Sequence, residues 1–212
     1  VIGFVLGIIS GVKEGKLIDK IIRGYCYILM STPTFWLGIL FIMIFSVSLG
    51  WFPVALSVPI GVVSSQVSLV ERIQHIILPA LTLSVISISS MCMYTREKVL
   101  EIMKSDYILF AKARGEKTSK IVLNHVLKNV SLPAITLQFL SFSELFGGTI
   151  FVEQVFSYPG LGQATVSAGL KGDLPLLMGI AIISLVFVYS GNIIADLLYR
   201  VVDPRIREGR EL

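Results

Sequence analysis

The chain has 212 residues, of which 54% are hydrophobic and 15% are charged, and its formal net charge is +4. Soluble domains contain about 45–50% apolar and about 25% charged residues. The composition therefore argues against a soluble enzyme, a nucleic-acid-binding protein and a disordered tail, and it predicts an all-α integral membrane protein.

Long stretches without Asp, Glu, Lys or Arg predict the membrane spans. A helix needs roughly 20 apolar residues to cross ~30 Å of hydrocarbon. Residues 1–12 are apolar, and we expect them to be the end of a partial first span whose N-terminal part is missing. The remaining spans are expected at about 25–49, 73–94, 132–152 and 176–199, all within one transmembrane domain over 1–212.

Two local patterns refine the first spans. Gly3, Gly7 and Gly11 recur at every fourth residue, and Gly15 extends the series. Small residues on one face let helices approach closely in lipid, so this face is predicted to pack against another helix; a chance pattern in a glycine-rich chain is the alternative. Pro33 lies inside the span over 25–49 and predicts a kink.

The basic residues set the orientation. Of the 18 Lys and Arg residues, 16 lie in three segments, 13–23, 96–128 and 200–210. Because positive residues favour the cytoplasmic side, these three segments are predicted to be cytoplasmic. The opposite side then carries only Arg72 and Lys171.

The cytoplasmic segment over 96–130 has the pattern of an ordered unit. Ser105 and Asp106 are suited to cap a short helix, and Gly115 is suited to end it as the C′ residue. A second helix is expected to follow from Thr118, with small residues exposed at Ala111, Ala113 and Gly115. Such a unit is either a docking element that fits into a groove on a partner, with small residues allowing close approach, or an ordinary solvated loop.

The cytoplasmic segment contains DYILFAKARG, then HVLKN and then LP. These stretches resemble the coupling loop, also called the EAA loop, of ABC importer permeases. The resemblance is strongest to the branch that imports dipeptides, oligopeptides and nickel. The chain departs from the broader family pattern in two ways. Six residues before the loop glycine, the broader family has Glu, whereas this chain has Leu109. Family members also have six membrane spans, and fewer are visible here. The matching stretches are, in chain order, PTFWLGILFIMIFSVSLGWFP, HIILPALTLS, DYILFAKARG, HVLKN followed by LP, FGGTIFVEQVFSYPGLG and DLLYRVVDPRIREG.

The resemblance implies a multi-pass permease subunit in a prokaryotic inner or plasma membrane. Its cargo would be peptides, nickel or metal chelates, and the helix at 106–115 would couple closure of ATPase subunits to alternating access. The implied partners are a second homologous permease, two ATP-binding subunits that hold ATP and magnesium, and an extracellular or periplasmic binding protein. This chain itself would bind no cofactor and would not be an enzyme. The residues that match the coupling loop are Asp106, Tyr107, Ala111, Ala113, Arg114, Gly115, His125 and Asn129.

Other candidate residues lie outside this loop. Glu144 falls about twelve residues into its span, where a centred charge costs about 2.5–3.5 kcal/mol, so it either lines a translocation path or is a packed carboxylate. Pro159, with Gly160 and Gly162 free to adopt positive φ, predicts a turn in an outer loop. The two histidines stand apart from each other and from the cysteines, so no metal site is expected.

The main alternative is a secondary transporter driven by an ion gradient. It would predict several intramembrane carboxylates and paired broken helices, whereas the chain has one deep carboxylate and no internal repeat. A membrane scaffold that moves no cargo is the second alternative.

Overall fold

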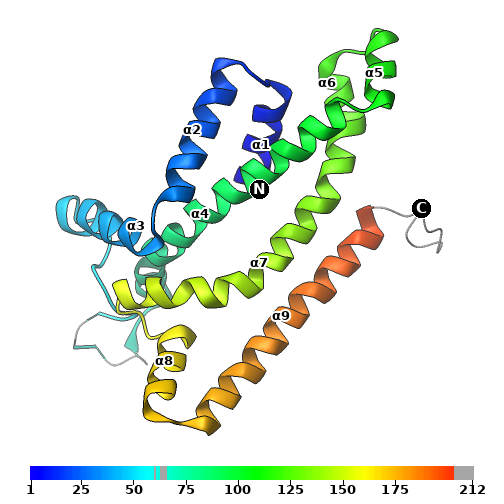
Figure 1. Cartoon of the computed structure of the whole chain (residues 1–212). Helices are drawn as coiled ribbons and strands as arrows, with labels where there is room; N and C mark the ends of the chain where they lie inside the picture. The colour runs from blue at the N-terminus through cyan, green and yellow to red at the C-terminus, as the bar shows by residue number, and fades with distance from the viewer. Residues whose placement is uncertain (60, 63–65, 203–212) are drawn as a thin grey trace. The chain divides into compact units, whose positions relative to one another are not determined.

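The computed structural model describes residues 1–59, 61, 62 and 66–202, with the side chains at 140, 142–148 and 199–202 left aside. All regular structure in this part of the chain is helical, in agreement with the predicted all-α class (Figure 1). The helices are α1 (Ile2–Val12), α2 (Leu17–Ser31), α3 (Thr34–Phe41), the π-helix η1 (Ile42–Ser48), α4 (Leu69–Met103), α5 (Asp106–Ala113), α6 (Thr118–Ile121), the π-helix η3 (Val122–Val126), α7 (Leu127–Val155), α8 (Leu161–Lys171) and α9 (Leu174–Val202).

The chain forms two compact units. The first unit consists of Val1–Met30, Ser87–Phe142 and the described residues from Tyr189 onward. The second unit consists of Ser31–Ile86 and Ser143–Val188. The predicted cytoplasmic segment over 96–130 therefore lies entirely in the first unit, and the predicted outer loop around Pro159 lies in the second.

Among the described residues, α4 and the Leu174–Leu198 part of α9 are long and apolar enough to cross a membrane. A third span results if α2 and the α3–η1 pair count as one broken span. The prediction of a kink at Pro33 was too mild, because the helix stops at Ser31 and a new one starts at Thr34. Proline removes a backbone donor and disfavours helical backbone at the residue before it. The span predicted over 132–152 lies in α7, partly beyond the described side chains.

The glycine face of α1 packs against α4, as predicted. A Cβ atom at Gly7 would lie 2.5 Å from the carbonyl oxygen of Cys92, and one at Gly11 would lie 2.6 Å from Cγ1 of Val99. Gly3 meets the same helix at Ile88. Gly15 does not continue this face, since it lies in the turn after α1 with φ of +74° and has no neighbour for a Cβ within 4 Å.

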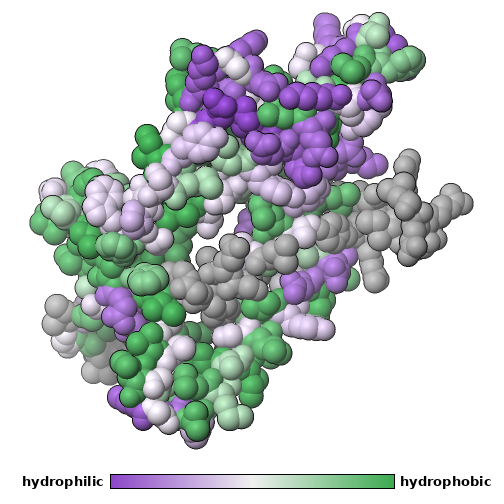
Figure 2. Space-filling view, viewed as in Figure 1, coloured by the Kyte–Doolittle hydropathy of each residue, from purple (hydrophilic) through white to green (hydrophobic). Residues whose placement is uncertain are grey.

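Each unit has its own apolar cluster. In the first unit the buried cluster joins α4, α5, α6, η3 and α7, and side chains of α1 pack against it. In the second unit Leu78, Val152 and Phe156 form the buried centre, surrounded by partly buried side chains that include Phe41 and Tyr158. Figure 2 shows hydrophilic residues gathered around α5, α6 and the turn between α1 and α2.

Candidate functional site

Helix α5 is a two-turn helix with a well-defined end. Gly115 has φ of +80° and follows the C-cap residue Arg114. The Gly115 N–H donates to the Lys112 carbonyl at 2.9 Å, and the Glu116 N–H donates to the Ala111 carbonyl at 3.2 Å. These two bonds make a Schellman motif, in which a residue with positive φ ends the helix. The prediction that Gly115 is the C′ residue is confirmed.

The start of α5 differs in detail from the prediction. Ser105 is the N-cap residue by its extended backbone, but its hydroxyl makes no capping bond to α5. The hydroxyl instead donates to the Ile102 carbonyl at 2.6 Å, in the last turn of α4. The serine side chain therefore closes the preceding helix, and it fixes a tight connection between α4 and α5.

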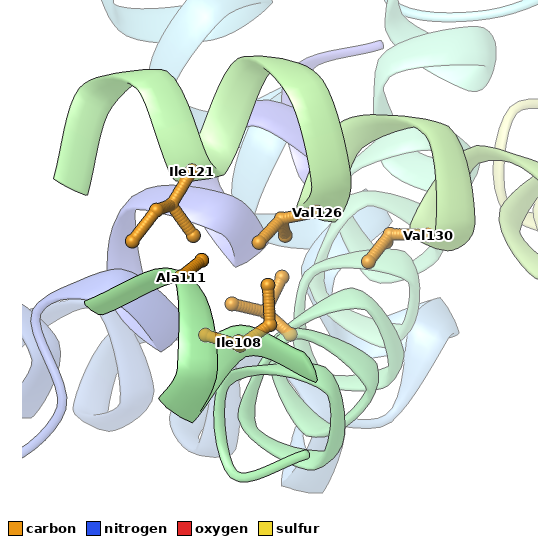
Figure 3. Close-up of a cluster of buried hydrophobic side chains, with 6 residues drawn as sticks. Ile108, Ala111, Ile121, Val126 and Val130 are labelled. Carbon is orange, nitrogen blue, oxygen red and sulfur yellow. The ribbon is translucent and has the colours of Figure 1, made fainter. Parts of the chain in front are cut away.

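One face of α5 is buried in the cluster of the first unit. Ile108 and Ala111, three residues apart and therefore on the same face, contact the cluster, whose other buried members are Val99, Ile121, Val126 and Val130 (Figure 3). The prediction of Ala111 as part of an exposed small-residue surface is wrong. Its side chain is only 6% exposed, because α4, η3 and α7 supply a core on that side.

The opposite face of α5 is exposed and more apolar than predicted. Phe110 is 66% exposed, and Leu109 and Tyr107 are also exposed. Ala113 lies at the end of the same helix, and both it and Gly115 are exposed. Sequence reasoning singled out the small residues and missed Leu109 and Phe110. We refer to the exposed side chains of Leu109, Phe110 and Ala113 as the α5 face.

Three of the predicted residues meet beside α5. Asn129 donates from its amide to the Tyr107 hydroxyl at 3.1 Å and to the His125 carbonyl at 2.9 Å. The rings of Tyr107 and His125 lie 6.3 Å apart. The His125 Nε2 atom is also 3.7 Å from a carboxylate oxygen of Glu116. These contacts attach α5 to η3 and α7, so the three residues hold the helix in place.

The remaining two residues predicted in this segment stay in solvent. Asp106 occupies the first turn of α5, where a negative charge is favourable beside the free N–H groups of a helix. Arg114 is exposed at the other end. A carboxylate at the start and a cation at the end leave the α5 face between them apolar.

The predicted outer turn has a different basis. Gly160 has φ of −110° and Gly162 lies inside α8, so the prediction of positive φ at these residues is wrong. Both glycines instead give room to Glu153, whose carboxylate would collide with a Cβ at either position. That carboxylate accepts a bond from the Gln163 N–H at 2.7 Å. Pro159 precedes this site and is exposed.

Two further sequence predictions concern ionisable groups and metals. Glu144 lies in helix α7, and its side chain is outside the described residues. Within the part of the chain that the structure covers, no three His, Cys, Asp or Glu side chains are placed to share a metal ion. Cys26 and Cys92 are free thiols, and both are buried in the first unit.

Sequence reasoning missed one buried ionic group, Asp19. Its carboxylate is paired with Arg96 at 2.8 Å, and the two side chains are 1% and 7% exposed. The signal was present in the sequence, because Asp19 is a lone acidic residue among Lys16, Lys20 and Arg23 at the start of a predicted span. Its partner, however, lies 77 residues away along the chain.

Comparison with known proteins gives consistent matches over almost the whole chain. The family described as "Binding-protein-dependent transport system inner membrane component" matches residues 3–208. The oligopeptide transport system permease protein AppB of Bacillus subtilis (strain 168) is 38% identical over 200 residues, which are 94% of this chain and 62% of that protein. The di/tripeptide transport system permease protein DppB of Pseudomonas aeruginosa (strain UCBPP-PA14) is 31% identical over 223 residues, covering 98% of this chain and 66% of that protein.

A putative peptide transport system permease protein of Brucella abortus (strain 2308) is 33% identical over 206 residues, covering 97% of this chain and 64% of that protein. The chain thus spans slightly less than two thirds of the length of these relatives.

Proposed function

Because this chain belongs to the family of inner membrane components of binding-protein-dependent transport systems, we propose that it is a permease subunit of an ATP-driven peptide importer. Peptides are favoured over nickel or metal chelates by the names of the relatives, which refer to oligopeptide and di/tripeptide transport. The chain would provide part of the path through the membrane. ATP and magnesium would be held by two separate ATP-binding subunits, and a second permease and an external binding protein would complete the importer.

The α5 face is the observation that supports a coupling role most directly. Helix α5 is short and has one face in the core, yet Leu109, Phe110 and Ala113 are exposed on the other side. Neighbouring apolar side chains exposed on one helix face mark a surface that a partner can cover. A groove on an ATP-binding subunit would bury this face, and the cluster behind Ile108 would transmit its displacement to α4 and α7.

A bulky side chain on the α5 face tests this role. Ala113→Trp would keep the partner groove from closing over α5, and we expect ATP-driven peptide uptake to be lost while membrane insertion is unchanged. Lys120→Trp places the same bulk on exposed α6 and is the matched control, with uptake expected to persist. Uptake at the wild-type rate by Ala113→Trp would contradict the coupling role.

Gly115 tests the shape of the same element by another route. Its φ of +80° is strained for any side chain, although nothing lies within 4 Å of a Cβ there. A bulky substitution at Gly115 is therefore expected to impair uptake by altering the end of α5 and not through a collision inside the permease. Rescue of uptake by Gly115→Asn, the residue most tolerant of positive φ after glycine, would support this reason.

Glu144 is proposed to line the translocation path, where its carboxylate would meet a peptide amine. Its depth in the predicted span over 132–152 supports this, because a carboxylate there is favourable only when it faces protein or water. Glu144→Gln is expected to reduce uptake more than it reduces the amount of protein in the membrane. An equal loss of both would indicate a packing role.

The outer loop is proposed to receive the external binding protein. Pro159 is exposed, and Glu153 fixes the chain that follows it through the bond to the Gln163 N–H. Gly160 and Gly162 allow this close approach, so the loop would present a fixed surface.

A further inference from the structure

Asp19 collects hydrogen bonds from three different segments. Arg96 of α4 donates from Nε to Oδ1 at 2.8 Å and from Nη2 to Oδ2 at 3.2 Å. The Ser10 hydroxyl of α1 donates to Oδ1 at 2.6 Å, and the Gly15 N–H in the turn donates to Oδ2 at 2.9 Å. Each carboxylate oxygen thus accepts two bonds, and the group is fully satisfied although buried.

These bonds join the hairpin of α1 and α2 to one position on α4. The guanidinium approaches the carboxylate with two donors, an arrangement that fixes orientation as well as distance. Arg23, on the next turn of α2, is 3.9 Å from the same carboxylate and is more exposed, so it adds little. Arg96 is the residue of α4 that makes the two-donor contact with the hairpin.

The same hairpin also touches residues 96–130, which contain α5 and to which we refer as the coupling segment. Phe4, Ile8 and Val12 of α1 pack against the cluster that contains Ile108 of α5. Glu14, in the turn, is 3.7 Å from Lys104, which follows the last residue of α4. The hairpin therefore contacts both the helix that leads into α5 and the core on which α5 rests.

The glycine face accounts for the contact of α1 with α4, whereas Asp19 belongs to α2. At Gly7 and Gly11 this contact brings α1 directly against Thr95 and Val99 of α4. A buried ion pair generally contributes little net stability compared with apolar residues of the same size, whereas it can select one arrangement. Asp19 and Arg96 are in the right place to make that selection.

We propose that Asp19 and Arg96 are positioning residues that lock the α1–α2 hairpin to the coupling segment, so that displacement of α5 moves the hairpin with it. The inference rests on the proposed function, since it requires that ATP-binding subunits push on α5. The ion pair would convert a local push into a movement of one body that includes α1, α2, α4 and α5.

The movement can be measured in the complete importer reconstituted in lipid. Lys16, in the turn before α2, and Lys112 of α5 are both exposed, and Lys16→Cys with Lys112→Cys would carry two spin labels. Cys26 and Cys92 are buried and are poor competitors for labelling. The distribution of distances between the two labels is expected to have one narrow peak, at the same position in the nucleotide-free and ATP-trapped states. A change in that distance between the two states would overturn the proposal.

Replacing the pair separates positioning from stability. Asp19→Leu/Arg96→Met removes both charges and retains apolar bulk, so the protein is expected to insert and assemble normally. The label distance is expected to broaden, and peptide transported per ATP hydrolysed is expected to fall severalfold. A wild-type transport ratio in this double variant would show that the ion pair has only a structural role and would overturn the proposal.

Two controls keep the results interpretable. Lys98 and Glu101 form an exposed ion pair on α4, with 2.8 Å between Nζ and Oε2. Glu101→Gln breaks this pair and should leave transport per ATP unchanged. Asp19→Asn retains the shape of the side chain and is expected to lower transport per ATP as well, which covers the case in which the double variant fails to assemble. Absence of ATP-driven uptake by the wild-type complex would refute the proposed function itself, whereas normal coupling in the Asp19 variants would refute only the positioning role.

Discussion

Gly7→Ala is the sharpest test of the close contact between α1 and α4. The new Cβ would lie 2.5 Å from the Cys92 carbonyl oxygen and 2.6 Å from Cβ of Thr95. Ordinary contacts between such atoms begin near 3.5 Å, so the helices would have to separate by about 1 Å. Two of the three nearest atoms belong to backbone or to a Cβ, and these cannot move aside as a flexible side chain would.

The expected size of the effect follows from two opposing terms. Overpacking of this kind costs about 1–3 kcal/mol. Alanine in place of glycine inside a helix returns roughly 0.5–1 kcal/mol. The net loss of unfolding free energy is therefore about 0–2.5 kcal/mol and centred near about 1 kcal/mol. For a chain of this size a loss of about 1 kcal/mol lowers Tm by about 2–4 °C.

Thermal unfolding of the purified protein in a mild detergent measures this shift. Gly24→Ala is the matched control, because Gly24 also lies in a helix, α2, but has no atom within 4 Å of a Cβ position. The control is expected to leave Tm unchanged or to raise it slightly. Equal Tm values for Gly7→Ala and Gly24→Ala would refute the packing of α1 against α4.

Two more substitutions test the local architecture. Ile108→Ala removes a fully buried side chain and is expected to cost about 2–5 kcal/mol of unfolding free energy. Leu109→Ala, on the exposed side of α5, should cost under about 0.5 kcal/mol. Similar losses for the two variants in denaturant unfolding would show that the two faces are misassigned. Glu153→Ala removes the acceptor for the Gln163 N–H and is expected to cost about 1–2 kcal/mol. Exposed Gln154→Ala is its control, and faster proteolysis confined to the loop of the Glu153 variant would support the assignment, while equal protease resistance would argue against it.

Local signals in the sequence were sufficient for part of the fold. The short helix over 106–113 and its end at Gly115 were predicted because helix-ending chemistry depends on neighbouring residues. The packing of Gly3, Gly7 and Gly11 was predicted because their spacing is itself the signal. Both features depend only on residues close together in the sequence: the spacing of the glycines in α1 and the residues that end α5.

Features that depend on distant parts of the chain were not predicted. The sequence did not show that Ala111 faces a core, because the side chains that cover it come from α4, η3 and α7. Asp19 gave no indication that its partner would be Arg96. In the outer loop, glycine has two uses, freedom of φ and lack of a Cβ, and the wrong one was inferred at Gly160 and Gly162, where room for Glu153 is the reason.

We propose that this permease works as part of an ATP-driven importer. Purification of the full-length protein from its native membrane in a mild detergent, followed by identification of the proteins that accompany it, tests this most directly. Stoichiometric ATP-binding subunits and a second permease are expected to accompany the protein, and the ATP-binding subunit is expected to cross-link to a cysteine placed at Ala113. A protein that purifies alone, and that captures no ATP-binding subunit even with a cross-linker at that position, would contradict the proposal.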